Sequence, residues 1–226
     1  MAEKRSNLFW AAILRVGIGM PIIALIIILP AGTWAYWQGW MYMVTLFLPM
    51  FFVLPYILHK DPAVLERRMR MREKESAQRK IIMLSYLYFL LAFILPGLDI
   101  RFGWSNVPSL VSIIANAFVL VGYLTFVWVL TVNSYLSRTV EVDAGQKVVS
   151  TGPYGIVRHP MYFGVTIMYL ASPLALGSYW ALIPAALIIP LLVARIRNEE
   201  QVLLRDLPGY AEYRQKVKYR LLPGVW

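Results

Sequence analysis

Six apolar segments set the first limit on how this chain can fold. A helix that crosses a bilayer needs about 20 largely apolar residues, and six segments reach or approach that length. They cover residues 9–30, 34–58, 81–99, 109–133, 161–176 and 179–197. The composition agrees, because 59% of the residues are apolar and only 15% are charged, whereas average globular domains have about 45–50% and 25%. The sequence therefore predicts an all-α integral membrane protein, a single membrane domain over residues 1–226, with about six (five to six) transmembrane helices.

The last two apolar segments differ from the others in being short and interrupted by Pro173 and Pro184. The connector between them, LALGSYW, is too short to be a loop domain and is typical of a tight turn. We therefore expect residues 161–197 to form a tight antiparallel helical hairpin.

Basic residues are unevenly distributed along the chain. With six helices and the N-terminus inside, every Lys and Arg except Arg101 falls on one side of the membrane. Positive charge concentrates on the cytoplasmic side, so both termini are expected in the cytoplasm. The net charge of +10 then indicates orientation and contact with anionic lipid headgroups. Membrane lipids are the partners that this charge predicts; nucleic acid is not expected, and no protein partner can be inferred.

Two charged stretches outside the apolar segments are expected to lie along the membrane surface. Residues 61–80 are rich in Lys and Arg and begin with an Asp-Pro pair, which suits the cap and first position of a helix. In the tail, Tyr210, Tyr213 and Val217 share one helical face, which is expected to enter the headgroup layer.

Several kinds of site are excluded by the residue types present. The chain has no cysteine and only two histidines, His59 and His159, so disulfides and Cys- or His-rich metal sites are excluded. It also lacks the motifs of dinucleotide-binding folds, phosphate loops, serine hydrolases and zinc proteases. We expect no metal site.

Two polar clusters are brought together by the expected hairpin. Pro160 suits the first position of the fifth helix, which places His159 and Tyr162 at its cytoplasmic start. The sixth helix returns antiparallel and ends at ARIRNEE, residues 194–200. His159, Tyr162, Arg195, Glu199 and Glu200 should therefore converge. Arg195 and Glu199 are four residues apart and share a helix face, so a simple surface ion pair is an alternative interpretation.

A pocket for a small zwitterion is the functional interpretation of these clusters. A helix N-terminus favours a carboxylate, and Glu199 suits an ammonium group. Tyr154 and Tyr162 could line a flat ring, so the pocket would hold an amino-acid end and an aromatic base together.

Three motifs resemble a known family in their order along the chain. GPYGIVRHPMYFG, then RIRNEEQVLL, then GYAEYRQKVKYRLLP are similar to the isoprenylcysteine carboxyl methyltransferase family and, more loosely, to the related phospholipid methyltransferases. The resemblance covers about residues 133–226. It implies a membrane methyltransferase that uses S-adenosylmethionine, with residues 134–226 as the cofactor-binding core and residues 1–133 as helices that shape an acceptor tunnel.

The resemblance also assigns roles to individual residues. The implied cofactor-binding residues are Gln146, Lys147, Val148, Val149, Tyr154, His159, Pro160, Met161, Tyr162, Glu199 and Glu200. Arg195 would orient the acceptor. The register between Glu199 and Glu200 stays open. The active site would face the cytoplasm.

The methyl acceptor cannot be read from the residues. The resemblance favours an isoprenylcysteine-type carboxylate, and a small thiol or a lipid amine is also compatible. Two other functions stay open. One is an NADPH-dependent sterol-type reductase of similar architecture, in which Arg158 and Lys147 could serve the 2′-phosphate, although the acidic pair argues against it. The other is a lipid-binding membrane scaffold without enzymatic activity.

Overall fold

Helices make up all the regular secondary structure in residues 2–69 and 76–226, which this computed structural model describes. They are α1 (Ala2–Ala31), α2 (Trp37–Lys60), α3 (Pro62–Arg68), α4 (Ser76–Phe102), α5 (Ser109–Val132), α6 (Pro160–Ala175), α7 (Leu182–Asp206) and α8 (Tyr210–Lys216), with a short 3₁₀ helix, η1 (Gly152–Gly155). The six apolar segments fall in α1, α2, α4, α5, α6 and α7. The prediction of an all-α protein is therefore confirmed.

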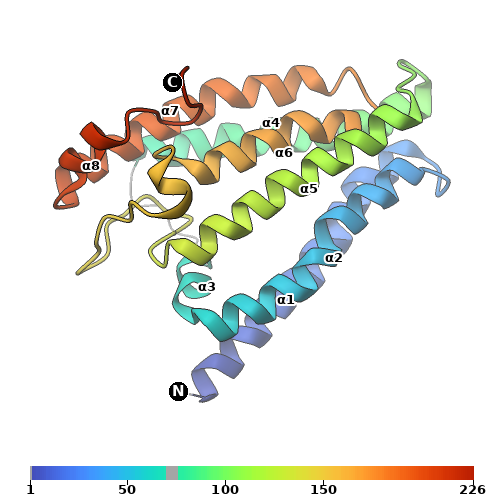
Figure 1. Ribbon diagram of the computed structural model, residues 1–226. Coiled ribbons are helices and arrows are strands. Elements are labelled where there is room, and N and C mark those ends of the chain that lie inside the picture. The colour runs from blue at the N-terminus through green and yellow to red at the C-terminus, as the bar shows by residue number, and fades with distance from the viewer. Residues whose placement is uncertain (1, 70–75) are drawn as a thin grey trace.

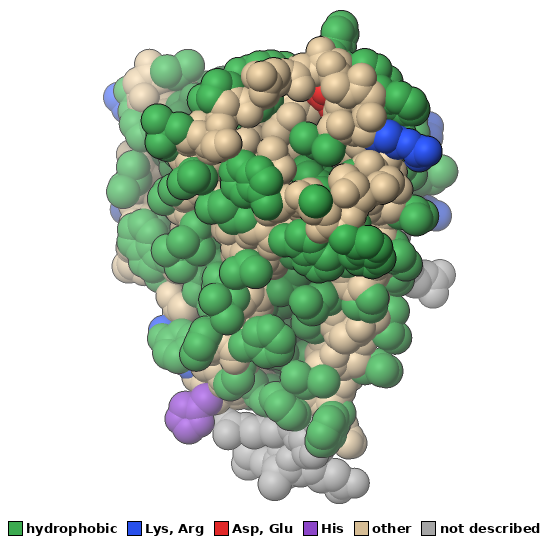
Figure 2. Space-filling model, turned by 90° about the vertical axis from the view of Figure 1, so that its right-hand side faces the viewer, with side chains coloured by type: hydrophobic (Ala, Val, Ile, Leu, Met, Phe, Trp, Pro, Cys, Tyr) green, Lys and Arg blue, Asp and Glu red, His purple; other side chains and the backbone are tan. Residues whose placement is uncertain are grey.

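Apolar helices of membrane-spanning length identify the chain as an integral membrane protein. Within the described ranges, four helices are long and apolar enough to cross a bilayer: α1 from Asn7, α2, α4 from Gln78, and α5. Hydrophobic side chains cover most of the face in Figure 2, and Lys and Arg lie at its margins. Helix α6 has 16 residues, and α7 carries charges in its second half. The count of six spans and the side of the termini therefore stay predictions.

Three turns lie together at one end of the molecule, which we call the turn end (Figure 1). They join α1 to α2, α4 to α5, and α6 to α7. Each exposes a tryptophan: Trp34, Trp104 and Trp180. Tryptophan concentrates at membrane–water interfaces, so the α6–α7 turn lies at the same expected interface as the other two. The tight hairpin is confirmed, since only residues 176–181 join α6 to α7.

Helices α5 and α6 approach closely at two glycines. A Cβ atom at Gly122 would lie 2.6 Å from the carbonyl oxygen of Gly164, and a Cβ atom at Gly164 would lie 2.7 Å from that of Gly122. Small residues allow such close backbone packing between membrane helices. This crossing fixes where α6 begins relative to the end of α5.

The buried carboxylate of Asp99 ties two turns together at the turn end. It accepts hydrogen bonds from the backbone N–H of Ser105 at 2.7 Å and from its hydroxyl at 2.6 Å. It also accepts from the hydroxyl of Ser178 at 2.5 Å. Ser178 lies in the α6–α7 turn, so one carboxylate attaches the hairpin to the end of α4.

The expected surface helix over residues 61–80 is shorter than predicted. Only Pro62–Arg68 is helical as α3, residues 76–80 already belong to α4, and residues 70–75 lie outside the described residues. The predicted cap is confirmed, because Asp61 Oδ1 accepts from the N–H of Ala63 at 3.1 Å.

The prediction for the tail helix α8 was wrong about what covers its apolar face. Tyr210, Tyr213 and Val217 are buried and pack with Leu207, against Val148, instead of entering the headgroup layer. An amphipathic pattern identifies an apolar face, but it does not say which surface covers that face.

Candidate active site

A cavity lies at the end opposite the turns, where α6 begins and α7 carries its charged residues. Its walls come from the loop after α5, from η1, from the start of α6, from the second half of α7 and from α8. The volume of the cavity is about 100 Å³. We call this end of the molecule the site end.

Pro160 determines how α6 begins. Proline fits the first helical position because it has no N–H to leave unpaired, and it disfavours helical geometry in the residue before it. His159 accordingly has φ −125° and ψ 59°. Its N–H donates to the carbonyl of Arg220 at 2.8 Å, and the N–H of Arg158 donates to the carbonyl of Tyr219 at 3.0 Å. The tail thus runs alongside the entrance to α6.

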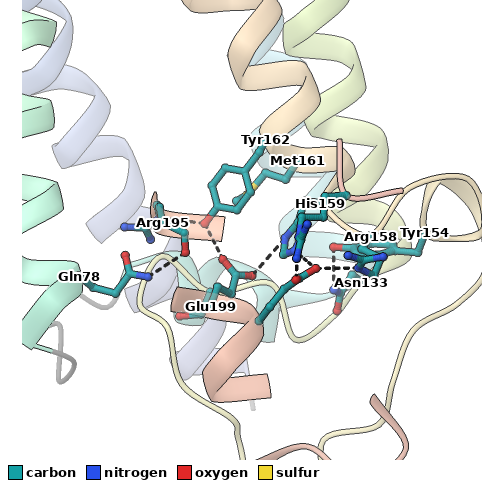
Figure 3. Close-up of polar contacts among 12 residues, drawn as sticks. Gln78, Asn133, Tyr154, Arg158, His159, Met161, Tyr162, Arg195 and Glu199 are labelled. Atoms are coloured by element: carbon teal, nitrogen blue, oxygen red, sulfur yellow. Dashed lines mark hydrogen bonds and ion pairs between the residues drawn. The ribbon is translucent and has the colours of Figure 1, made fainter. Parts of the chain in front are cut away.

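Tyr162 links Arg195 to Glu199. Its hydroxyl donates to Glu199 Oε2 at 2.6 Å and accepts from Arg195 Nε at 2.8 Å. Figure 3 shows the phenol reaching from α6 between the two α7 side chains. Arg195 Nη2 also donates to the carbonyl of Arg138 at 2.9 Å. The convergence of the two helices predicted from the hairpin is therefore present, with a tyrosine hydroxyl between the cation and the carboxylate.

Glu200 faces away from the cavity and holds the tail. Its Oε1 accepts from Arg158 Nε at 2.7 Å and lies 3.4 Å from His159 Nε2, while its Oε2 accepts from Arg220 Nε at 2.8 Å. Burial alone would raise the pKa of Glu200, but the hydrogen bonds from His159, Arg158 and Arg220 outweigh it and hold the pKa well below its ordinary value. Adjacent residues point about 100° apart on a helix, so Glu199 is left facing the cavity.

The guanidinium of Arg158 donates hydrogen bonds to groups of the protein itself. Besides Glu200, its guanidinium donates from Nη1 to the carbonyls of Val217 and Lys218, each at 2.7 Å. A buried guanidinium with these partners has little freedom to meet a ligand phosphate, the role that a reductase would require of it.

Tyr154 is held by partners that sequence reasoning missed. Asn133, at the end of α5, donates from Nδ2 to the Tyr154 hydroxyl at 2.8 Å, and the hydroxyl of Tyr213 donates to the Tyr154 carbonyl at 2.8 Å. Burial raises the pKa of Tyr154 far above its ordinary value of 10, so this phenol keeps its proton.

Most of the predicted site residues line the one cavity. These are the loop residues 146–149, Tyr154, His159, Met161, Tyr162, Arg195 and Glu199. Pro160 and Glu200 do not line it: the first sets the start of α6, and the second pairs with Arg158 and Arg220.

Several wall residues were not predicted. Thr139 and Glu141 in the loop, and Tyr210 and Tyr213 in α8, also line the cavity. The tyrosines belong to the apolar face identified in the tail, so their pattern was visible although its role was not. Gln78 of α4 donates from Nε2 to the carbonyl of Arg195 at 3.2 Å (Figure 3), and no spacing in the sequence signals that contact.

Known proteins match the part of the chain that holds this cavity. Residues 110–207 match the family model described as phospholipid methyltransferase, a range that contains Tyr154, His159, Tyr162, Arg195 and Glu199. The chain is also 36% identical over 93 residues to the Delta(14)-sterol reductase TM7SF2 of Mus musculus, which corresponds to 39% of this chain and 22% of the reductase. The chain thus spans about a fifth of that relative's length.

The family match supports a membrane methyltransferase, and it covers α5, the loop, α6 and α7. The first two of the three motifs lie inside the matched segment, and the third begins after it, at Gly209. The resemblance is confirmed over residues 110–207, which match the phospholipid methyltransferase family, the family of membrane methyltransferases like isoprenylcysteine carboxyl methyltransferase.

Proposed function

We propose that the protein is an S-adenosylmethionine-dependent methyltransferase whose methyl donor binds in the site-end cavity. The observation that carries this proposal is the wall formed by Lys147, His159, Tyr162 and Glu199, because it combines a carboxylate, a cation and a helix N-terminus inside the family-matched segment. A zwitterionic amino-acid group needs those complementary charges.

The wall residues fit such a donor. Glu199 would accept from its ammonium group, and Lys147 with the N-terminus of α6 would hold its carboxylate. Tyr154 and Tyr213 would pack on its adenine ring. The hydroxyl of Tyr210, another wall residue, is buried and has no hydrogen-bond partner in the part of the chain that the structure describes, which is the kind of atom that a polar ligand satisfies.

The sulfonium of the donor supplies a methyl group that is already activated for transfer. The tasks left to the protein are therefore to position the acceptor and to exclude water. Arg195 would orient an anionic acceptor, because its guanidinium lies at the cavity wall on the Tyr162 hydroxyl. We favour an isoprenylcysteine-type carboxylate, with a small thiolate or a lipid amine as the other candidates.

The apolar part of the acceptor would lie along α4 and α7. An apolar groove of about 630 Å³ is lined there by side chains that include Tyr88, Leu91 and Leu187. Towards the site end, the same two helices meet where Gln78 donates to the carbonyl of Arg195. The groove reaches Trp104 and Trp180 at the turn end, so an acceptor would need a long apolar chain to lie in it and also place its polar end near Arg195.

The cavity would face the cytoplasm. Lys and Arg residues gather in the loops of the site end, whereas the turn end carries exposed tryptophans. This distribution matches the concentration of positive charge on the cytoplasmic side, and the donor would then enter from the aqueous phase.

Thermal unfolding of the purified protein in detergent tests the donor. S-adenosylhomocysteine, the product form of the donor, should raise the Tm by mass action. Glu199→Gln should remove that shift, while Asp206→Asn, an exposed change on the same helix, should keep it. The absence of any shift with S-adenosylhomocysteine would sink the proposal.

Transfer of labelled methyl into membrane extracts tests the reaction and identifies the acceptor. Arg195→Ala should abolish transfer and still bind S-adenosylhomocysteine. Unchanged transfer in this variant would contradict the role of Arg195 in orienting the acceptor.

A second candidate, an NADPH-dependent reductase, is favoured by the similarity to the mouse sterol reductase. A reductase would give the opposite result in the thermal unfolding test: NADPH would raise the Tm, and S-adenosylhomocysteine would not. Stabilisation by neither ligand would favour the lipid-binding scaffold.

A further inference from the structure

Helix α3 contacts the loop that covers the cavity, although α3 lies outside the family-matched segment. In Figure 1, α3 lies beside the start of the loop that follows α5. We propose that Arg67 and Arg68 of α3 are positioning residues that hold this loop, residues 133–150, in the shape that binds the methyl donor. This inference rests on the proposed function, because it takes the cavity to be the donor site.

Arg67 contacts the loop at two points. Its Nε donates to Asp143 Oδ2 at 2.5 Å, and its Nη1 donates to the carbonyl of Ser134 at 2.6 Å. The guanidinium also lies over the ring of Tyr135, 5.3 Å from its centroid. Both side chains of the ion pair are about one-fifth exposed, 19% for Arg67 and 22% for Asp143, so solvent screens the pair less than it would a surface pair.

Asp143 transmits this contact to a predicted donor-binding residue. Its N–H donates to Gln146 Oε1 at 2.9 Å, and its carbonyl accepts from the N–H of Gln146 at 3.0 Å. Gln146 begins the loop segment 146–149 that lines the cavity. Arg67 is therefore linked to Gln146 through one intermediate residue, Asp143.

Arg68 contacts the same loop between the points that Arg67 holds. Its Nη1 donates to the carbonyl of Ser137 at 3.1 Å and lies 3.8 Å from the sulfur of Met161. Ser137 and Met161 both line the cavity. The Arg68 guanidinium also lies 5.1 Å from the ring centroid of Phe126 on α5, so it bridges the loop, α5 and the start of α6.

Helix α3 is itself anchored to the N-terminal helices. Asp61 caps its start, and Arg15 of α1 donates from Nη1 to the carbonyl of Met69, directly after its end, at 3.1 Å. The loop has no helix of its own between α5 and η1, so its shape depends on contacts of this kind. Two arginines expected to meet lipid headgroups are instead directed at the loop.

A charge reversal tests this role. Arg67→Asp places a second carboxylate beside that of Asp143. It should weaken the binding of S-adenosylhomocysteine about tenfold, which is the loss expected when a hydrogen-bonded charge partner is removed. The KM for the methyl donor should rise, while kcat at saturating donor stays near that of the wild type. The double variant Arg67→Asp/Asp143→Arg should recover most of the affinity, which a general loss of stability would not allow.

A ligand-free readout separates this inference from the proposed function. Amide hydrogen exchange in residues 137–149 should rise in Arg67→Asp and fall again in the double variant. Arg67→Gln gives a milder change in case the reversal prevents folding, and Arg214→Ala, an exposed change on α8, should alter neither exchange nor binding.

The outcomes are distinct. Two results would overturn the role of α3 and leave the proposed function standing. In the first, Arg67→Asp binds S-adenosylhomocysteine as tightly as the wild type does. In the second, the double variant binds it no more tightly than Arg67→Asp does. A wild-type protein that does not bind S-adenosylhomocysteine would overturn the proposed function itself, and unchanged exchange in the loop would overturn the α3 contact independently.

Discussion

Arg158 and Glu200 form a buried ion pair, with 2.7 Å between Arg158 Nε and Glu200 Oε1. The pair joins the residue before His159 to the second of two adjacent glutamates on α7. Since the other oxygen of Glu200 accepts from Arg220, the two glutamates have different surroundings: Glu200 fixes the tail, and Glu199 lines the cavity.

Glu200→Ala should destabilise the fold. It leaves Arg158 buried without its carboxylate, and breaking a buried pair in this way costs about 3–5 kcal/mol. Urea unfolding in detergent measures the loss. Asp206→Asn is the matched control, because its pair with Arg205 is exposed and should contribute less than about 1 kcal/mol. Equal losses in the two variants would contradict the structural role of Glu200.

The same carboxylate should make stability depend on acidic pH. The folded pKa of Glu200 is held below its ordinary value of 4.5, so the unfolded chain takes up the proton first as the pH falls. The contribution of Glu200 is therefore fully present above about pH 4.5 and is lost as the pH falls towards the folded pKa. The Tm difference between wild type and Glu200→Ala should be constant from pH 7 to 5 and shrink below 4.5. A difference that shrank between pH 7 and 5 would point to another group.

Tyr162→Phe should impair ligand binding without unfolding the protein. The change keeps the ring and removes the hydroxyl that donates to Glu199, the carboxylate proposed to accept from the ammonium group of the donor. Hydrogen bonds to charged groups of this kind correspond to about a tenfold to hundredfold effect, here expected in the affinity for S-adenosylhomocysteine measured by calorimetry. Tyr123→Phe on α5 should bind as the wild type does. Wild-type affinity in Tyr162→Phe would show that the bridge is dispensable.

Gly164→Ala should destabilise the contact between α5 and α6. The new methyl group would lie 2.7 Å from the carbonyl oxygen of Gly122, and such overpacking costs about 1–3 kcal/mol. Gly17→Ala on α1 is the control, because a Cβ there meets nothing within 4 Å. Thermal unfolding of both variants measures the effect, and Gly164→Ala should have the lower Tm. Equal Tm values for Gly164→Ala and Gly17→Ala would exclude tight packing at this crossing.

Leu187→Trp should obstruct the apolar groove between α4 and α7. Filling it should raise the KM for a lipophilic acceptor about tenfold, within the range of overpacking effects, and leave the affinity for S-adenosylhomocysteine unchanged. Val121→Trp, at an exposed apolar position on α5, should leave both parameters unchanged. An unaltered KM in Leu187→Trp would place the acceptor elsewhere.

The meeting of α6 and α7 could be predicted because it follows from local rules. Pro160 marks a helix start, the short connector requires a hairpin, and a hairpin places His159 opposite Glu199. The choice between Glu199 and Glu200 could not be predicted, because it depends on which of them meets Arg158. That pairing depends on the path of the tail, where backbone groups of residues 158 and 159 bond to those of 219 and 220.

The contribution of α3 could not be predicted for a related reason. Arg67 and Asp143 are 76 positions apart, and a basic segment beside a membrane favours lipid contact by composition alone. Long-range ion pairs have no periodicity in the sequence. The same limit applies to α8, whose apolar face was visible while the loop that covers it was not.

The hydrogen bonds of Asp99 to Ser105 and Ser178 have a mechanical consequence for the hairpin. They attach the α6–α7 turn to α4 at the end remote from the cavity, while the bonds of Arg158 to Glu200 and of Tyr162 to Glu199 join the two helices at the cavity. The hairpin is therefore fixed at both of its ends, so α6 and α7 should move as one rigid unit, and a ligand would enter the cavity past the loop and the tail.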